Sequence, residues 1–212
     1  MTGAYRPVEP GRLAHLLAEH LSGLAAHDRA LRVAVDGPRC AAPASLANAL
    51  IAPLRARGRA ADHIAAESFW RDASLRLEYG HEDVESFAEW LDAGALCREV
   101  LDPLGPDGTG SYLPSLRDPA TNRATRVPAR HAEPGAIVIV SGELLLGRGL
   151  PFDATVHLST SAAGRVRRTH AERQWTLPAF DRYDADVRPA DTADVVVRVD
   201  DPRHPAVRGV AA

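Results

Sequence analysis

The stretch from Leu31 to Leu50 constrains the fold more than any other part of this 212-residue chain. It begins with a short apolar run, Leu31 to Val35, which is typical of a buried strand. Asp36-Gly37 and a loop of small residues follow, and an apolar helical pattern opens at Ser45. The stretch therefore predicts a strand, a tight loop and a helix. This is the layout in which loop amides and a helix N-terminus face a bound phosphate.

The loop departs from the usual phosphate-binding motif, G-x-x-x-x-G-K-[ST], at three diagnostic positions. Aligned on Gly37, the sequence has Ala42 for the second glycine, Pro43 for the lysine and Ala44 for the hydroxyl residue, with Ser45 one position later. All 25 basic residues are arginine, so no lysine elsewhere in the sequence can take over as a phosphate ligand. The layout indicates a nucleotide kinase, whereas the loop predicts that part of the chemistry has been lost.

Composition narrows the class of protein. A chain of 212 residues, 45% of them hydrophobic, can bury one sizeable core, and we expect an N-terminal tail and amphipathic helix over 1–29, one domain over 30–209 and a tail over 210–212. A net charge of −3 argues against a nucleic-acid-binding surface. No segment approaches 18 uninterrupted apolar residues, which predicts a cytoplasmic protein that does not span a membrane. Cys40 and Cys97 lack metal-ligand spacing, so no metal site is predicted, and a homodimer stays open.

The remaining pattern predicts an α/β fold: a doubly wound, mostly parallel sheet of five strands alternating with helices. Residues 1–9 are expected to be disordered, and residues 112–127 to form a hairpin with its turn near Asp118 to Asn122. After the first strand, further strands are expected over 62–66, 136–140, 154–158 and 194–199, and helices over 10–27, 81–104, from Ser161 and from Trp175 to Arg188.

Several polar residues fall where a ligand would be expected. Glu67 follows the second strand, at the edge of a parallel sheet where ligands bind, so it is a candidate general base; the alternative is a surface glutamate that caps a turn. Arginines of the hairpin either contact an anionic substrate or are solvated, and those after Ser161 form either an arginine-rich lid over phosphates or a solvated helix face. The candidates are Glu67 and Arg71 for catalysis; Gly37, Arg39, Ser45, Arg168 and Arg173 for the cofactor; and Tyr79, Arg117, Arg123, Arg126 and Trp175 for the substrate.

With these motifs in place, residues 30–209 resemble the uridine kinase-like P-loop nucleoside kinases, particularly an actinobacterial branch. VAVDG at Val33 to Gly37 looks like the strand that enters the phosphate loop, and ESFWR at Glu67 to Arg71 is similar to a family segment whose aspartate is the catalytic base. The resemblance implies ATP and Mg²⁺ as cofactors and a nucleoside as substrate. It places the family's second acidic motif on Ser141, with Glu143 as a displaced stand-in. Further matches are REVLDPLGPDGTGSYLPSLRDPATNRATR, PFDATVHL, WTLPAFDRY and ADVVVRVDDPRHPAVRG.

Three functions remain open on this sequence. The chain is a weakened nucleoside kinase, a non-catalytic protein that binds a nucleoside or related metabolite, or an ATP-independent enzyme of secondary metabolism that uses Glu67 as acid or base. Loss of two or three charge-stabilising groups would cost about 5 to 12 kcal/mol of transition-state stabilisation, at about 2.7 to 4 kcal/mol each. Arg39 would restore part of this by contacting a phosphate with two hydrogen bonds. ATP-driven transfer is therefore expected to be weakened or lost.

Overall fold

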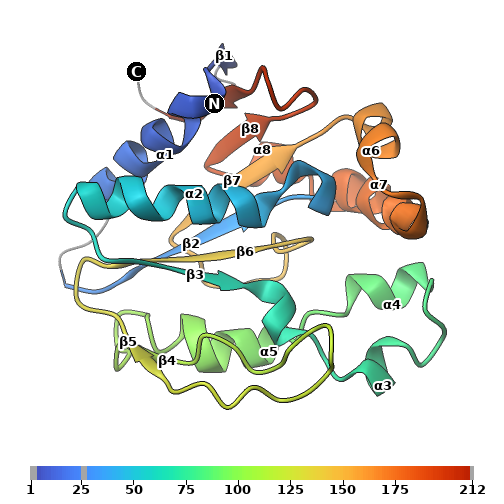
Figure 1. The fold of residues 1–212 in the computed structure, drawn as a ribbon, viewed down its shortest axis with the longest axis horizontal. Coiled ribbons are helices and arrows are strands. Elements are labelled where there is room, and N and C mark those ends of the chain that lie inside the picture. Colours follow the sequence, from blue (N-terminus) through green and yellow to red (C-terminus); the bar gives the residue numbers. More distant parts are fainter. Residues whose placement is uncertain (1–3, 25–27, 211–212) are drawn as a thin grey trace.

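A seven-stranded sheet organises the protein (Figure 1). The computed structural model describes residues 4–24 and 28–210. The strand order is β1-β9-β8-β7-β2-β6-β3, and the five strands from β8 to β3 are parallel, as the sequence predicted. Two short antiparallel strands, β9 and β1, extend the sheet beyond β8. The strands are β1 (Arg6–Pro7), β2 (Leu31–Asp36), β3 (Ala61–Ala65), β6 (Ile137–Gly142), β7 (Ala154–Ser159), β8 (Val195–Arg198) and β9 (Ala206–Arg208).

Helices cover both faces of the sheet. Helices α1 and α2 pack against each other and over the face that carries Val33 and Ile139, whereas α5 packs over the face that carries Val138 and Val140. A two-stranded ribbon, β4 (Ser111–Tyr112) with β5 (Arg130–His131), lies beside α5. The helices are α1 (Pro10–Leu24), α2 (Pro43–Ala56), α3 (Ala73–Arg76), α4 (Val84–Ala88), α5 (Ala93–Leu96), α6 (Ala162–Arg168), α7 (Leu177–Asp186) and α8 (Pro189–Thr192), with 3₁₀ turns over 39–41, 66–69 and 171–176 and a π-helical turn over 97–101.

The central strand β2 is buried along its whole length. It pairs with β6 on one side and β7 on the other, so that Val33 lies beside both Ile139 and Ala154. Where β2 begins, the buried Arg32 guanidinium makes two 2.9 Å hydrogen bonds to Asp153. Where it ends, the chain enters the small-residue loop at the carboxyl edge of the sheet.

The expected helix over 81–104 is wrong, because two aspartates start new helices inside it. The Asp83 carboxylate accepts a hydrogen bond from the Ser86 amide at 2.6 Å, and the Asp92 carboxylate accepts one from the Ala95 amide at 2.8 Å. Such N-caps favour a fresh helix start. Residues 81–104 therefore form α4, α5 and the π-helical turn instead of one long helix. The breaks between these elements let the chain change direction.

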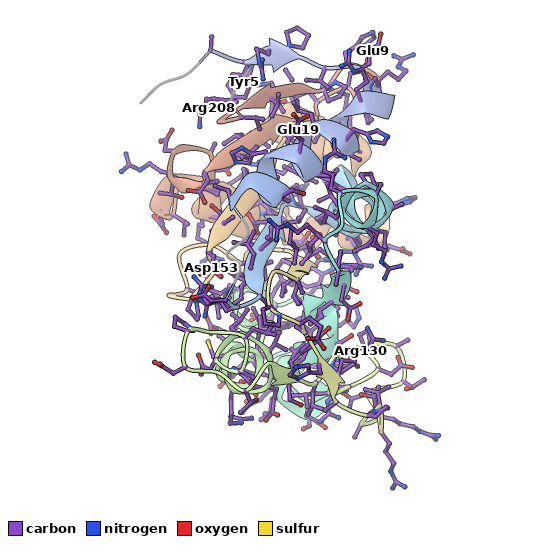
Figure 2. All side chains as sticks on the ribbon, turned by 90° about the vertical axis from the view of Figure 1, so that its left-hand side faces the viewer. Tyr5, Glu9, Glu19, Arg130, Asp153 and Arg208 are labelled. Atoms are coloured by element: carbon purple, nitrogen blue, oxygen red, sulfur yellow. The ribbon has the colours of Figure 1, made fainter. Side chains whose placement is uncertain are left out.

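The N-terminal elements in the structure also differ from those expected from the sequence. Arg6–Pro7 forms β1 rather than a disordered tail, and the Tyr5 ring lies under the guanidinium groups of Arg198 and Arg208, 4.1 and 5.3 Å from its centroid. Figure 2 shows Tyr5 and Arg208 together at one end of the molecule and Arg130 at the other. Helix α1 ends at Leu24, and the rest of the expected helix (25–27), like residues 1–3 and 211–212, lies outside the described residues.

The expected hairpin is longer than predicted. Its paired strands, β4 and β5, begin and end outside 112–127, while its tip does turn where expected, since the Asn122 amide donates to the Asp118 carbonyl at 2.9 Å. In the parts of the chain that the structure describes, no helix has the length and apolar character needed to cross a membrane.

Candidate functional site

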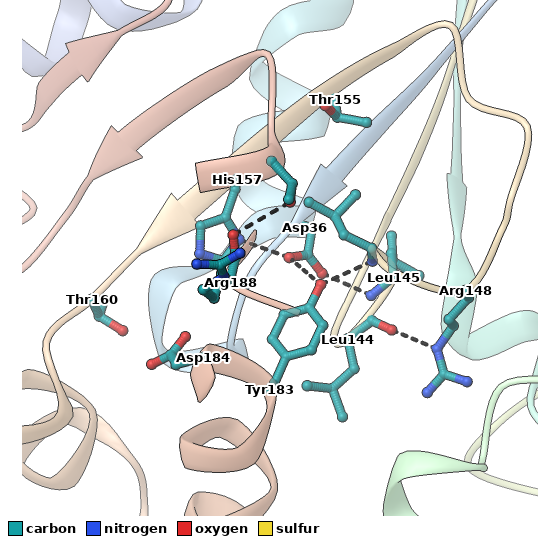
Figure 3. A network of polar contacts seen from close by, with 12 residues as sticks. Asp36, Leu144, Leu145, Arg148, Thr155, His157, Thr160, Tyr183, Asp184 and Arg188 are labelled. Atoms are coloured by element: carbon teal, nitrogen blue, oxygen red, sulfur yellow. Dashed lines mark hydrogen bonds and ion pairs between the residues drawn. The ribbon is translucent and has the colours of Figure 1, made fainter. Parts of the chain in front are cut away.

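A buried carboxylate fixes the base of the loop after β2 (Figure 3). Asp36 is fully buried, and its Oδ1 accepts a hydrogen bond from the Leu145 amide at 2.8 Å. Its Oδ2 accepts the Tyr183 hydroxyl at 3.0 Å and lies 2.7 Å from His157 Nδ1. The Tyr183 oxygen in turn accepts the Leu146 amide at 2.9 Å, and burial together with Asp36 raises the pKa of this hydroxyl. Asp36 thus joins β2, β7, α7 and the segment after β6.

The loop itself needs glycine at its first position. Gly37 has φ +154°, and a Cβ there would lie 2.8 Å from the Leu158 Cβ and 2.9 Å from the Leu158 carbonyl oxygen. A 3₁₀ turn over 39–41 follows, Ala42 is left-handed at φ 57°, and Pro43 starts α2. The strand, loop and helix predicted from the sequence are therefore confirmed.

Backbone amides of this loop are already hydrogen-bonded within the protein. The amides of Gly37, Ala41 and Ala42 donate to the carbonyls of Gly142, Pro38 and Arg39 at 3.1, 2.7 and 2.9 Å. Pro38 and Pro43 have no N–H to offer. The Cys40 carbonyl accepts a hydrogen bond from Arg168. Few loop donors are left to face an anion.

Glu143 supplies an anion from within the chain. Its Oε1 accepts the Arg39 amide at 2.9 Å, and its Oε2 lies 2.8 Å from Arg173 Nη2 and 4.0 Å from Arg39 Nε. The side chain is only 9% exposed. Burial raises the pKa of Glu143 despite the two arginines, and nearby Glu67 raises it further. The Glu143 carboxylate, from the segment after β6, thus accepts the hydrogen bond of a loop amide that an external anion would otherwise contact.

Ser141 lies in β6 at the position where the family resemblance expected an acid. Its Oγ is 2.8 Å from His63 Nε2, and His63 Nδ1 is 3.0 Å from Asn48 Oδ1. Because the Asn48 oxygen can only accept, Nδ1 carries the proton and Nε2 accepts the Ser141 hydroxyl. Burial lowers the pKa of His63, which favours this neutral form. Among the described residues, no group of three or more His, Cys, Asp or Glu side chains is placed to hold a metal ion.

Two cavities meet at Arg39, Glu172 and Arg173. The first, of about 410 Å³, lies beside the loop and is called the loop cavity. The second, of about 450 Å³, is called the tryptophan cavity. Besides the shared residues, the loop cavity is lined by Pro38, Cys40, Glu143, Arg168, Thr169, His170, Thr176 and Phe180, and the tryptophan cavity by Glu67, Trp70, Arg76, His81, Trp90, Pro119, Ala120 and Trp175.

Aromatic rings pack edge to face or tilted against one another along the tryptophan cavity. The ring centroids of Trp70 and Trp90 are 5.1 Å apart, and those of Trp90 and Trp175 are 5.9 Å apart. Phe87 packs behind Trp90 and Trp175, with centroid distances of 5.2 and 5.5 Å. Such contacts stabilise rings in fixed orientations. The cavity therefore has a rigid apolar wall made from segments far apart in the sequence.

The predicted site residues divide into two groups. Gly37, Arg39, Glu67, Arg168, Arg173 and Trp175 lie in the loop or line one of the cavities, and Arg39 and Glu67 form an ion pair. Within the described residues, the walls of these two cavities do not include the other six candidates. Arg71 lies 3.9 Å from Glu89, Arg117 pairs with Asp72 at 3.0 Å, Tyr79 is 75% exposed, and Ser45, Arg123 and Arg126 are exposed.

The arginines after Ser161 make contacts within the protein. Arg165 is buried and pairs with Asp181 and Asp184 at 2.9 and 2.7 Å. Arg168 donates to the carbonyls of Val199 and Cys40, and Arg173 pairs with Glu143. In this conformation these side chains hold the loop and α7 together.

Sequence reasoning missed most of the tryptophan cavity. From the sequence, Trp90 is expected to be a core residue because it lies in an apolar helical pattern. Arg76 is expected to be one charged residue of a loop in which charged and apolar residues alternate loosely. The hairpin reaches the cavity through Pro119 and Ala120 rather than through its arginines. The one signal available was indirect: all three tryptophans of the chain line this cavity.

No family model and no curated protein sequence matches this chain. Solved structures do. A possible uridine kinase from Bacillus stearothermophilus is 19% identical with a TM-score of 0.69, and the match covers 86% of this chain and 96% of that one. The fold is that of the P-loop kinases. A candidate fructose transport system kinase from Silicibacter sp. TM1040 is 20% identical with a TM-score of 0.59, covering 85% and 94% of the two chains. At these identities the likeness concerns the fold alone.

Proposed function

We propose that this protein uses the P-loop kinase fold to bind a small organic molecule in the tryptophan cavity and has lost ATP-driven phosphoryl transfer. One observation carries the proposal: the Glu143 carboxylate occupies the Arg39 amide in the loop where an external phosphate would be bound. The fold supports a uridine or sugar kinase ancestry, and the tryptophan cavity adjoins that loop at Arg39.

The residues present do not fit ATP and Mg²⁺. The three loop amides of Gly37, Ala41 and Ala42 donate to carbonyls, and Pro43 has neither an amide hydrogen nor a cationic side chain. A phosphate entering the loop would also meet the Glu143 carboxylate, which repels a second anion. The Ser141 hydroxyl that replaces the expected acid is already bonded to His63. No step of chemistry is therefore derived through ATP.

Calorimetric titration of the purified protein with ATP, with and without Mg²⁺, tests this proposal. A panel of nucleosides is titrated into the same protein, and into a Trp175→Leu variant that shortens the cavity wall. We expect no Mg²⁺-dependent ATP binding, together with binding of a small molecule that Trp175→Leu weakens. Tight Mg²⁺-dependent ATP binding, or phosphate transfer from ATP to any nucleoside, would overturn the proposal.

A second function remains open because Glu67 lines the same cavity. Its carboxylate is 32% exposed and is paired with Arg39, which holds an acid or base beside a bound molecule. An ATP-independent enzyme would lose turnover in Glu67→Gln while retaining ligand binding. A pure binding protein would convert no ligand in either form.

A further inference from the structure

Arg76 is a buried cation in the wall of the tryptophan cavity. Its side chain belongs to α3, and the residue is only 7% exposed. Its guanidinium carbon lies 4.9 Å from the Trp90 ring centroid and 5.1 Å from that of Trp70. Nε donates to the Arg71 carbonyl at 2.9 Å. The two rings and this one hydrogen bond hold the guanidinium fork in a fixed place.

This cation lacks a carboxylate partner. Within residues 4–24 and 28–210, no Asp or Glu oxygen lies within 4.0 Å of the Arg76 nitrogens, and the nearby Asp72 pairs with Arg117 instead. Burial lowers the pKa of the Arg76 guanidinium, the Asp72 charge opposes this shift, and the Arg117 charge adds to it. Contacts with aromatic faces recover part of the cost of burying this charge. A buried charge without an opposite charge is costly, so the site is suited to an anion brought by a ligand.

The other charges of the cavity largely balance one another. Arg39 pairs with Glu67, and Arg173 pairs with Glu143. Glu172, which lines both cavities, is exposed to solvent. Among the described residues, Arg76 is therefore the arginine of the cavity wall that no carboxylate contacts directly.

A second polar group in the wall lacks a partner. The indole Nε1 of Trp175 is buried and makes no hydrogen bond with the described residues. Trp175 also packs beside His81, with ring centroids 6.2 Å apart. Indole N–H groups that are buried normally donate to something. An acceptor atom on a bound molecule would satisfy this donor, while the flat faces of the tryptophans would contact its ring.

We propose that the tryptophan cavity selects a planar organic anion, with its carboxylate on the Arg76 fork and its ring against the tryptophans. The inference rests on the proposed function, because it assumes that a small molecule occupies this cavity. It differs from the expectation of a neutral nucleoside. Guanidinium groups recognise carboxylates with two parallel hydrogen bonds, which gives both affinity and orientation.

Intrinsic fluorescence tests this directly, because all three tryptophans line the cavity. Benzoate is titrated against benzamide, a neutral molecule of the same shape, with phenyl phosphate as a third probe. We expect saturable quenching in which benzoate binds at least about tenfold more tightly than benzamide, because a charged acceptor makes the stronger hydrogen bonds to a guanidinium. Phenyl phosphate binding more tightly than benzoate would replace the carboxylate with a phosphate ester as the preferred anion and overturn that part of the proposal.

Variants separate Arg76 from the general charge of the protein. Arg76→Gln should weaken benzoate binding at least about tenfold and leave benzamide unchanged. Arg98→Gln, which removes an exposed arginine paired with its neighbour Glu99, should bind benzoate like the wild type. Arg76→Lys keeps the positive charge but not the planar guanidinium fork. Its benzoate affinity should therefore lie between those of the wild type and Arg76→Gln. Circular dichroism checks folding; if Arg76→Gln does not fold, Arg76→Lys and the salt dependence of wild-type binding decide.

Equal binding of benzoate and benzamide, or unchanged benzoate binding in Arg76→Gln, would overturn the proposal. So would the absence of quenching by all three probes. Failure here is distinguishable from failure of the proposed function, because the latter is decided by Mg²⁺-ATP binding to the same protein. A neutral nucleoside that binds without ATP would refute the anion proposal alone.

Discussion

Replacing Glu143 with alanine should turn the loop into an anion site. An anion that approached the Arg39 amide in the wild type would lie within about 4 Å of the Glu143 carboxylate, because Glu143 Oε1 is itself 2.9 Å from that amide nitrogen. Two like unit charges at that distance repel by about 4 kcal/mol at an effective dielectric constant of about 20. Arg39 is half exposed, so screening reduces this to about 2 to 3 kcal/mol. The expected gain in anion affinity is about 30- to 150-fold.

Thermal unfolding in increasing pyrophosphate measures this gain. Without the anion, Glu143→Ala should be less stable by about 1 to 3 kcal/mol, because two charge-assisted hydrogen bonds are lost while the cost of burying a carboxylate is relieved. At a pyrophosphate concentration of about 100 times Kd, binding should return about 2.7 kcal/mol. For a chain of this length, that is a rise in Tm of about 5 to 11 °C.

Glu172→Ala is the matched control, because it removes an exposed carboxylate from the same cavity. We expect its pyrophosphate response to stay within about threefold of the wild type, as an exposed charge is well screened. The reasoning is refuted if pyrophosphate stabilises the wild type as strongly as Glu143→Ala. It is also refuted if pyrophosphate fails to stabilise the alanine variant at all.

Three further predictions concern stability. Although burial alone raises it, hydrogen bonds from Arg32 and Arg29 lower the pKa of Asp153 from 3.8 to about 2. This contributes about 2 to 3 kcal/mol that is present above pH 4 and lost towards pH 2, so Asp153→Asn should flatten urea-measured stability over that range. Tyr183→Phe should cost about 1 to 3 kcal/mol in urea unfolding, because Asp36 and the Leu146 amide lose a partner; an unchanged midpoint would argue against this. Burial lowers the pKa of His63, so stability should fall as pH drops below 6.5, and His63→Gln should remove that slope.

The parallel core of the fold followed from the sequence because its signals are local. Residues 136–140 form a continuous apolar run of the kind typical of a buried parallel strand, and the five strands predicted from 31 to 199 are the five parallel strands of the sheet. Gly37 was correctly predicted at the start of the loop, where there is no space for a side chain. Strand β1 was not found because it has two residues and pairs with β9 at the far end of the chain, and β9 was missed because it has only three residues.

The sequence predicted residues of the candidate site only where a single segment, such as the end of a strand, determines their position. Arg39 and Glu67 follow strands that are visible in the sequence, so their meeting at the carboxyl edge could be expected. The place of Arg76 between Trp70 and Trp90 could not, because it depends on how α3 and α4 fold back over the cavity. Arg71 and Tyr79 illustrate the converse, since neighbours of a site residue in sequence can point elsewhere.

The position of β2 in the middle of the sheet also bears on the order of synthesis. Its strand partners, β6 and β7, begin at Ile137 and Ala154, more than a hundred residues after Leu31. A nascent chain that has not yet emerged beyond β6 carries this strand, which is buried in the folded protein, with neither neighbour. Pairings over such sequence separations form slowly and leave apolar surface exposed meanwhile. The ribosome must therefore release most of this chain before its central strand can be completed.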